Sequence, residues 1–347
     1  MGNGPLTDYG RALGATTVSD RIFWDKETTE DEIGQKSGFL YRQPSLDWIR
    51  PSLNYRGLEL IKSYDQKSQE NEYITMQASA NVVLRFGPQD NKDKFIIVLE
   101  GGYAPTPRSN KSSTEKNYRS REHYIGYRIN QSWGIYAGLM DKAFGIRVPD
   151  HIAFSRISTQ TTMNDQTHGL MIHFTKPEYE WAAHFFAGNL SQEAPLRVKG
   201  ASLTGEYTLN HKVRLGGSFM TGKSTYLDQS HISTHARLGF GKGNSIMGEV
   251  GLNKKTILNS QTTINGRYAF LQGHVMAKRG LFTLLTTEYY VPNTELKNEV
   301  MRIGPGFQYF PNQGIEFRVD VYNSRVFSQT SVSEDSWDLT GQVHLWF

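Results

Sequence analysis

The chain has 347 residues, of which 37% are apolar, with a formal net charge of +4 and no cysteine. The apolar fraction lies below the roughly 45–50% of a typical soluble domain, and the small net charge gives no reason to expect nucleic acid as a partner. The absence of cysteine excludes disulfide bonds, thiolate metal sites, iron–sulfur clusters and a cysteine nucleophile. The longest apolar run, residues 95–99, is far shorter than the roughly 18 residues of a membrane-spanning helix.

From residue 54 onward, apolar and polar residues alternate with a period of two, which is the pattern of a β-strand. The clearest cases are residues 212–219 and 336–347. The alternation predicts about 16 strands, at 54–64, 72–86, 95–104, 121–130, 133–141, 167–175, 179–188, 199–209, 212–221, 232–241, 245–252, 266–278, 281–290, 299–310, 315–324 and 336–347. The first of these and 281–290 alternate poorly, and a count of 14 stays open.

The connections between these segments are alternately short and long. Turns such as Asn210-His211 and Arg279-Gly280 alternate with longer polar connections, such as 105–120, 142–166, 222–231, 253–265 and 325–335. An up-and-down array of this size must close, because open edges invite aggregation. A transmembrane barrel also explains the low apolar content, since only one face of each strand meets lipid. We therefore predict an all-β fold, a closed antiparallel transmembrane β-barrel over 54–347 with short periplasmic turns and long extracellular loops.

Aromatic residues gather near the predicted strand ends, as they do in the girdles of membrane barrels. They are Trp133, Tyr136, Tyr179, Trp181, Tyr289, Tyr290, Tyr309, Phe310, Trp337, Trp346 and Phe347. The alternative is that they are ordinary strand-forming residues.

Residues 1–53 precede the predicted barrel and are polar, with a mixed-charge patch from Asp25 to Lys36. This segment is a periplasmic extension, a short helix or a plug in the lumen, and the sequence does not decide between these. Because its aromatic residues, Trp24, Phe39, Tyr41 and Trp48, are poorly suited to water, we favour an ordered segment tucked against or inside the barrel.

The polar face of the strands would line the lumen, because a charge on the lipid-facing side costs about 2–4 kcal/mol at the membrane midplane. The predicted pore-lining residues carry both signs: Glu100, Glu122, Arg128, Glu180, Glu206, Arg214, Arg237, Glu249, Arg302, Glu316, Arg318 and Asp320. Such charges screen solutes in a water-filled pore. Alternatively, they pair across the wall and hold a filled lumen together. We favour the water-filled pore.

The predicted loop 142–166 is the longest and the least hydrophilic. A long loop with its own apolar residues is usually functional or packed. We expect it to fold into the barrel and narrow the pore, with Arg147, Asp150, His151 and Arg156 at the constriction. The alternative is a lid over the mouth of the barrel.

The C-terminal residues 340–347 resemble the last strand of Gram-negative outer-membrane β-barrel proteins of the porin-like class. Such proteins end in an amphipathic strand with a terminal aromatic residue, here Phe347, with apolar residues such as Leu345 at every second position. The glycine usually found five residues before the end stands one place early, as Gly341. The resemblance implies recognition of Leu345 and Phe347 by the barrel-assembly machinery. It also implies an outer-membrane location, with the signal peptide absent from this mature chain.

Other motifs predict no catalysis. Residues 217–224 match the phosphate-loop pattern, but no helical stripe follows them, so we interpret the match as accidental. His231 and His235 are four residues apart, yet no metal-ligand spacing is present, and we expect neither a metal nor a cofactor. Nothing fixes a nucleophile and base near one another, so we do not expect an enzyme.

The predicted function is a passive channel for small hydrophilic solutes or ions. The predicted partners are outer-membrane lipid and further copies of the chain or a periplasmic protein. The alternative function is a barrel that serves as the scaffold of a larger envelope complex for export or electron transfer, with its lumen filled by a partner or by residues 1–53.

Overall fold

The computed structural model describes residues 19–23, 28, 32, 48–64, 67–88, 93–105, 117–148, 150, 152–241, 243–296, 298–312, 314–328 and 334–346. Its strands are β1 (Ile49–Tyr64), β2 (Lys67–Phe86), β3 (Phe95–Tyr103), β4 (Tyr118–Arg119), β5 (His123–Arg128), β6 (Trp133–Met140), β7 (Thr167–Thr175), β8 (Tyr179–Phe186), β9 (Lys199–Asn210), β10 (Val213–Lys223), β11 (Leu227–Gly239), β12 (Ser245–Ile257), β13 (Thr262–Lys278), β14 (Leu281–Asn293), β15 (Asn298–Tyr309), β16 (Ile315–Phe327) and β17 (Glu334–Trp346). The described helices are α3 (Phe154–Thr159) and the 3₁₀ turn η4 (Ala194–Leu196).

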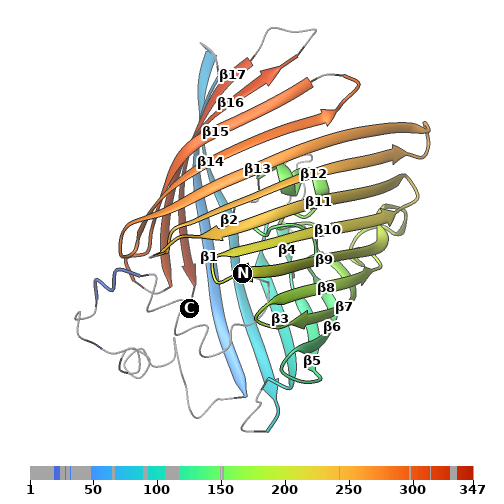
Figure 1. Cartoon of the computed structure of the whole chain (residues 1–347), viewed down its shortest axis with the longest axis vertical. Helices are drawn as coiled ribbons and strands as arrows, with labels where there is room; N and C mark the ends of the chain where they lie inside the picture. Colours follow the sequence, from blue (N-terminus) through green and yellow to red (C-terminus); the bar gives the residue numbers. More distant parts are fainter. Residues whose placement is uncertain are drawn as a thin grey trace.

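The strands form one closed antiparallel sheet in which each pairs with its neighbours in the sequence (Figure 1). β1 closes the barrel by pairing with both β2 and β17, and Leu345 of β17 lies opposite Tyr55 on one side and Ile315 on the other. Since β4 and β5 both pair with β3, they count as one interrupted strand. The predicted 16-strand antiparallel barrel is therefore confirmed. None of the helices in the described residues is long and apolar enough to cross a membrane.

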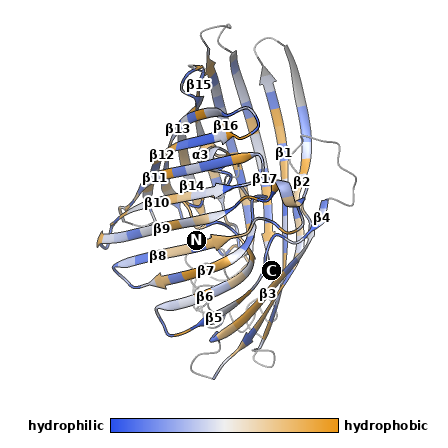
Figure 2. Ribbon diagram, turned by 90° about the vertical axis from the view of Figure 1, so that its right-hand side faces the viewer, coloured by the Kyte–Doolittle hydropathy of each residue, from blue (hydrophilic) through white to orange (hydrophobic). Residues whose placement is uncertain are grey.

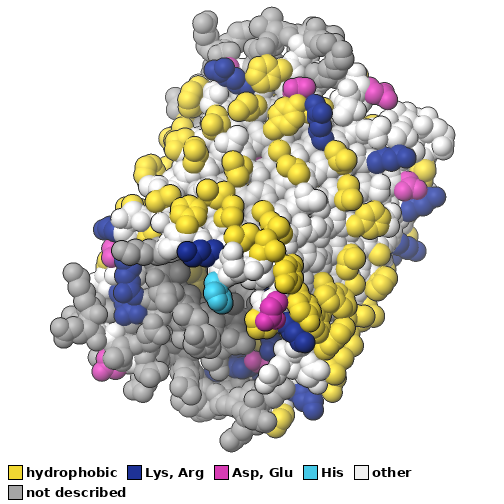
Figure 3. Space-filling view, in the orientation of Figure 1, with side chains coloured by type: hydrophobic (Ala, Val, Ile, Leu, Met, Phe, Trp, Pro, Cys, Tyr) yellow, Lys and Arg dark blue, Asp and Glu magenta, His cyan; other side chains and the backbone are white. Residues whose placement is uncertain are grey.

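The barrel is polar inside and apolar outside, the reverse of a soluble domain. In β11, Ile232 is largely exposed on the outer face, whereas its neighbours His231 and Ser233 are buried on the inner face. Hydropathy alternates in the same way along most strands (Figure 2), and hydrophobic side chains are spread over the outer surface (Figure 3). This inversion follows from the period of two, because successive side chains point to opposite sides of the sheet.

The two ends of the barrel differ in their connections. One end carries tight turns, among them Arg279-Gly280, where Gly280 has a φ of +78°. The other end carries three long connections, 104–117, 141–166 and 187–198. The remaining connections at this end are shorter than predicted, with 224–226 in place of 222–231 and 258–261 in place of 253–265. The reason is that polar residues continue the hairpins, as where Lys254 pairs with Asn265.

The first strand begins at Ile49 rather than at residue 54. Of the segment before it, residues 19–23 lie at the tight-turn end, where the backbone N–H of Asp20 donates to the carbonyl of Phe310 at 2.8 Å and that of Ile22 to Pro311 at 3.0 Å. Trp48 is exposed. The predictions for Trp24, Phe39, Tyr41 and most of the patch from Asp25 to Lys36 lie outside the described residues.

Two of the aromatic residues predicted for the girdles, Tyr136 and Tyr290, pack inside the barrel instead. Near the tight turns, Trp133 contacts Trp181 with ring centroids 5.3 Å apart. Tyr136, in contrast, packs on the inner face against Tyr124, with ring centroids 6.1 Å apart. Tyr290 stacks on Phe154 of the 141–166 connection at 5.6 Å. Packing inside the barrel thus competes with the interfacial preference of tyrosine. Phe347 lies outside the described residues.

Candidate functional site

The 141–166 connection, called the inner loop below, lies against the inner wall of the barrel. Its backbone N–H groups donate to wall side chains at two neighbouring points: Gly145 to Ser218 Oγ at 2.9 Å, and Ile146 to Glu249 Oε2 at 2.7 Å. Tyr268 donates to the other oxygen of Glu249 at 2.6 Å. A buried loop must satisfy its backbone groups somewhere, and here the polar wall supplies the acceptors.

Glycine is required at position 145 of the inner loop. Gly145 has a φ of +63°, a backbone conformation that residues other than glycine rarely adopt. A Cβ there would also lie 2.5 Å from Oε1 of Glu249. The loop can therefore approach the wall closely only because this residue has no side chain.

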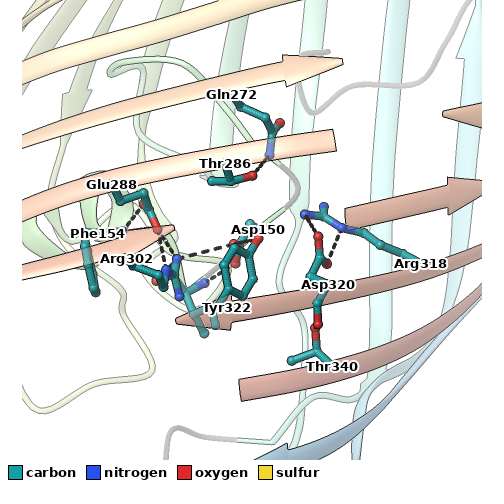
Figure 4. A network of polar contacts seen from close by, with 11 residues as sticks. Asp150, Phe154, Gln272, Thr286, Glu288, Arg302, Arg318, Asp320, Tyr322 and Thr340 are labelled. Carbon is teal, nitrogen blue, oxygen red and sulfur yellow. Dashed lines mark hydrogen bonds and ion pairs between the residues drawn. The ribbon is translucent and has the colours of Figure 1, made fainter. Parts of the chain in front are cut away.

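A second attachment centres on Arg302 of β15 (Figure 4). Its guanidinium donates to the buried carboxylate of Glu288 and, at 3.2 Å, to the carbonyl of Ile152 in the inner loop. It also lies 3.5 Å from the carboxylate of Asp150. The central carbon of the guanidinium, Cζ, lies over the ring of Phe154, 4.8 Å from the ring centroid. Glu288 in turn accepts the backbone N–H of Phe154 at 2.7 Å. A buried guanidinium needs such partners on several sides, and here they tie the loop to β14 and β15.

Apolar contacts complete the seat of the inner loop. Ile146, Val148 and Ala153 pack on Phe270 of β13, and α3 lies against β12, β13 and β14. Phe144 packs with Met220 of β10. The sequence prediction that this loop is packed rests on these same apolar residues.

The other side of the inner loop is open. Ile152 and Ile157 keep 39% and 46% of their surface exposed. Arg147 is partly exposed and pairs with Asp141 at the start of the loop, and burial lowers the pKa of Arg147. Arg156, also predicted for the constriction, is buried and donates to the carbonyl of Thr161.

Of the other predicted constriction residues, Asp150 faces Arg302 on the wall, and His151 lies outside the described residues.

The predicted pore-lining residues fall into groups along the inner wall. Near the tight turns, Arg214 bridges Glu180 and Glu206 at 3.1 and 3.0 Å, and Arg237 lies 2.8 Å from Glu206. Further along the wall, Arg318 pairs with Asp320 on the same strand at 2.7 Å.

The remaining predicted residues are more dispersed. Glu316 accepts from Gln308 at 2.6 Å, and Glu100 accepts from Gln77 at 2.8 Å. Glu249 and Arg302 hold the inner loop, as described above. Glu122 and Arg128 are half-buried on the β3–β5 side of the barrel.

Two further arginines, Arg119 and Arg121, lie on the same side of the barrel and are not among the predicted pore-lining residues. Both bond to Asn164 of the inner loop. Arg121 stands at the edge of a predicted strand, and Arg119 lies within a predicted loop, so the alternation did not assign either to a face.

No protein-family model matches the chain, and no curated protein matches its sequence. Solved structures of outer-membrane channels and porins share its fold. The outer membrane channel DcaP of Acinetobacter baumannii is 10% identical with a TM-score of 0.63, covering 86% of this chain and 97% of that one. The anion-selective porin from Comamonas acidovorans is 9% identical with a TM-score of 0.65, covering 86% and 99%. OprB of Pseudomonas putida is 9% identical with a TM-score of 0.64, covering 87% and 94%. At this identity the likeness defines the porin-type fold.

Proposed function

We propose that the protein is an outer-membrane channel through which small hydrophilic solutes or ions diffuse passively. Its polar interior and apolar exterior suit a barrel that is surrounded by lipid and holds water. The names of the similar structures, an outer membrane channel and an anion-selective porin among them, support the same location and role. The proposal assigns the chain no catalytic activity.

The observation that carries the proposal is the seating of the inner loop. Hydrogen bonds from Gly145, Ile146 and Phe154 hold it to one side of the wall, while Ile152 and Ile157 stay accessible on its other face. A loop fixed in this way narrows the lumen without filling it, which is how a diffusion channel is given a size limit.

The test is the conductance of the refolded full-length chain in a planar bilayer. We expect steady single channels, and a larger conductance after deletion of 146–156, because this deletion removes the contacts of the inner loop with Glu249, Glu288 and Arg302. Deletion of the exposed residues 190–196 in the 187–198 connection is the matched control and should leave the conductance unchanged. Absence of channels from the full chain would contradict the proposal.

The same measurement examines the segment before β1. A chain that begins at residue 48 keeps all the strands. Channels that appear only after this truncation would favour the alternative in which residues 1–47 close the lumen until a partner displaces them.

We further propose that the barrel associates with copies of itself in the membrane. One similar structure, OmpT of Vibrio cholerae, is described in a trimer form, which supports but does not assign this state. The test is chemical crosslinking of the protein in native membranes. We expect a ladder of bands up to the trimer, and a single monomer band would contradict the proposal.

A further inference from the structure

Two arginines of the barrel wall converge on a single neutral oxygen. Arg119 donates through an η nitrogen to Oδ1 of Asn164 at 2.6 Å, and Arg121 donates to the same oxygen at 3.3 Å. Arg119 also donates to the backbone carbonyl of Pro105 at 3.0 Å, and Arg121 to that of Met76 at 3.2 Å. Two like charges thus share an acceptor that carries no charge.

No carboxylate of the described residues pairs with either guanidinium. Two acids lie near the pair without bonding to it. Gln77 stands between Arg121 and Glu100, since Arg121 donates to Oε1 of Gln77 at 3.1 Å and Gln77 donates to Glu100 at 2.8 Å. Asp165 is near Arg119 but accepts from the backbone N–H and the hydroxyl of Thr162, at 2.8 and 2.6 Å. Arg121 is only 6% exposed, and the Nε atoms of both Arg119 and Arg121 are buried without a hydrogen-bond partner. Buried charges are normally paired, so this pair lacks an anion.

The backbone explains how the two side chains come together. Leu99 of β3 lies opposite His123, and Gly102 lies opposite Arg119. Two residues of β3 therefore face three residues, 120–122, of the other strand, which is a β-bulge. Leu99, opposite His123, is exposed on the outer face, so an unbroken alternation would also turn residues 121 and 119 outward. The bulge shifts the alternation and lets Arg119 and Arg121 turn inward together. Bulges of this kind re-aim side chains next to functional sites.

We propose that Arg119 and Arg121 form a binding site for an oxyanion group, a carboxylate or a phosphate, carried by a solute that enters the barrel. Planar guanidinium groups match the paired oxygens of such anions. The oxyanion replaces Oδ1 of Asn164 as the shared acceptor. Because β4 follows the 104–117 connection, the site lies toward the long-loop end of the barrel. It is next to Asn164, where the inner loop leads back to β7. The inference rests on the proposed function and names the class of solute.

The experiment measures anion binding by titration calorimetry on the refolded full-length protein, with sodium succinate and inorganic phosphate as the two probes. The informative variant is N164D, which places a carboxylate between the arginines and occupies the site from within the chain. We expect the affinity for the bound anion to fall about tenfold or more in N164D and in R119Q/R121Q, as befits the loss of charge-assisted hydrogen bonds. R267Q, which removes the same charge at an exposed position of β13, should bind within about twofold of the wild type.

The outcomes separate the two sources of the anion and the two proposals. Binding of succinate alone identifies a carboxylate solute, binding of phosphate alone identifies a phosphate, and binding of both supports the shared chemistry. Equal affinity in the wild type and N164D, or no binding of either probe by the wild type, overturns the site, even if R119Q/R121Q fails to fold. Bilayer conductance is measured on the same samples. Channels without anion binding leave the proposed function standing, whereas binding without channels leaves the site standing and refutes the channel.

Discussion

Replacing Arg302 with glutamine should release the inner loop from the wall. The substitution removes three contacts between wall and loop: the hydrogen bond to the carbonyl of Ile152 at 3.2 Å, the ion pair with Asp150 at 3.5 Å and the cation–π contact with Phe154 at 4.8 Å. A hydrogen bond from a charged donor contributes about 1.5 kcal/mol. The ion pair, counted at the magnitude of an exposed pair because Asp150 regains water when the loop detaches, and the ring contact contribute about 1 and 0.5 kcal/mol. The loop should therefore lose about 3 kcal/mol of attachment, which raises the detached population about 100-fold.

Thiol labelling measures the detached population directly. The chain has no cysteine, so S158C supplies the only thiol, at a position in α3 that is 1% exposed in the seated loop. When reseating is faster than labelling, the labelling rate follows the equilibrium population of the open form. We expect S158C/R302Q to react about 100-fold faster than S158C.

The control for this prediction is R267Q in the same S158C background. Arg267 of β13 is largely exposed and pairs only loosely, at 3.9 Å, with Glu299, so its loss should leave the labelling rate unchanged. If S158C and S158C/R302Q label at rates within twofold of each other, Arg302 does not hold the loop and the reasoning from these three contacts is wrong.

Three further substitutions test the orientation and packing of the barrel by equilibrium unfolding. L271R places a charge on the outer face, where Leu271 is exposed, and should destabilise the folded barrel in lipid vesicles by about 2–4 kcal/mol, and an unchanged stability would refute the assigned face. Y268F removes the hydrogen bond to Glu249 and should lower the free energy of unfolding by about 1–2 kcal/mol, with no change as the contrary result. G280A forces a side chain into a turn with a φ of +78° and should cost about 1 kcal/mol or more, seen as a lower denaturant midpoint, and an unaltered midpoint would contradict this.

The alternation of residue types was sufficient to predict the barrel, because the two faces of each strand meet different environments, one apolar and one polar. In β16, Phe317 and Val319 face outward, while Arg318 and Asp320 are buried inside. A one-residue error in register would exchange these faces along the whole strand, so the signal is strong wherever the strand is apolar on one side.

The lengths of the strands and the position of the arginine pair could not be predicted in this way. Beyond the apolar band, hairpins such as that of Lys254 and Asn265 continue through polar residues, since backbone pairing needs no apolar side chain. The bulge before His123 interrupts the period of two, which hides the inward orientation of Arg121. The bond from Arg121 to Asn164 joins residues 43 positions apart, and no local spacing reports such a contact.

Asn164, near the end of the inner loop, bonds back to Arg119 and Arg121, but the described residues between 145 and 154 bond to strands that follow the loop in the chain. The wall partners of these residues extend from Ser218 of β10 to Tyr322 of β16, where the bond to Asp150 spans 172 residues. Contacts of such long range form late in folding, because the intervening chain must be ordered first. The loop can thus reach its final position only when β16 is in place, next to the strand that closes the barrel. Assembly of the wall and narrowing of the lumen are therefore completed together, and a barrel that stalls before its last strands would be wide as well as open.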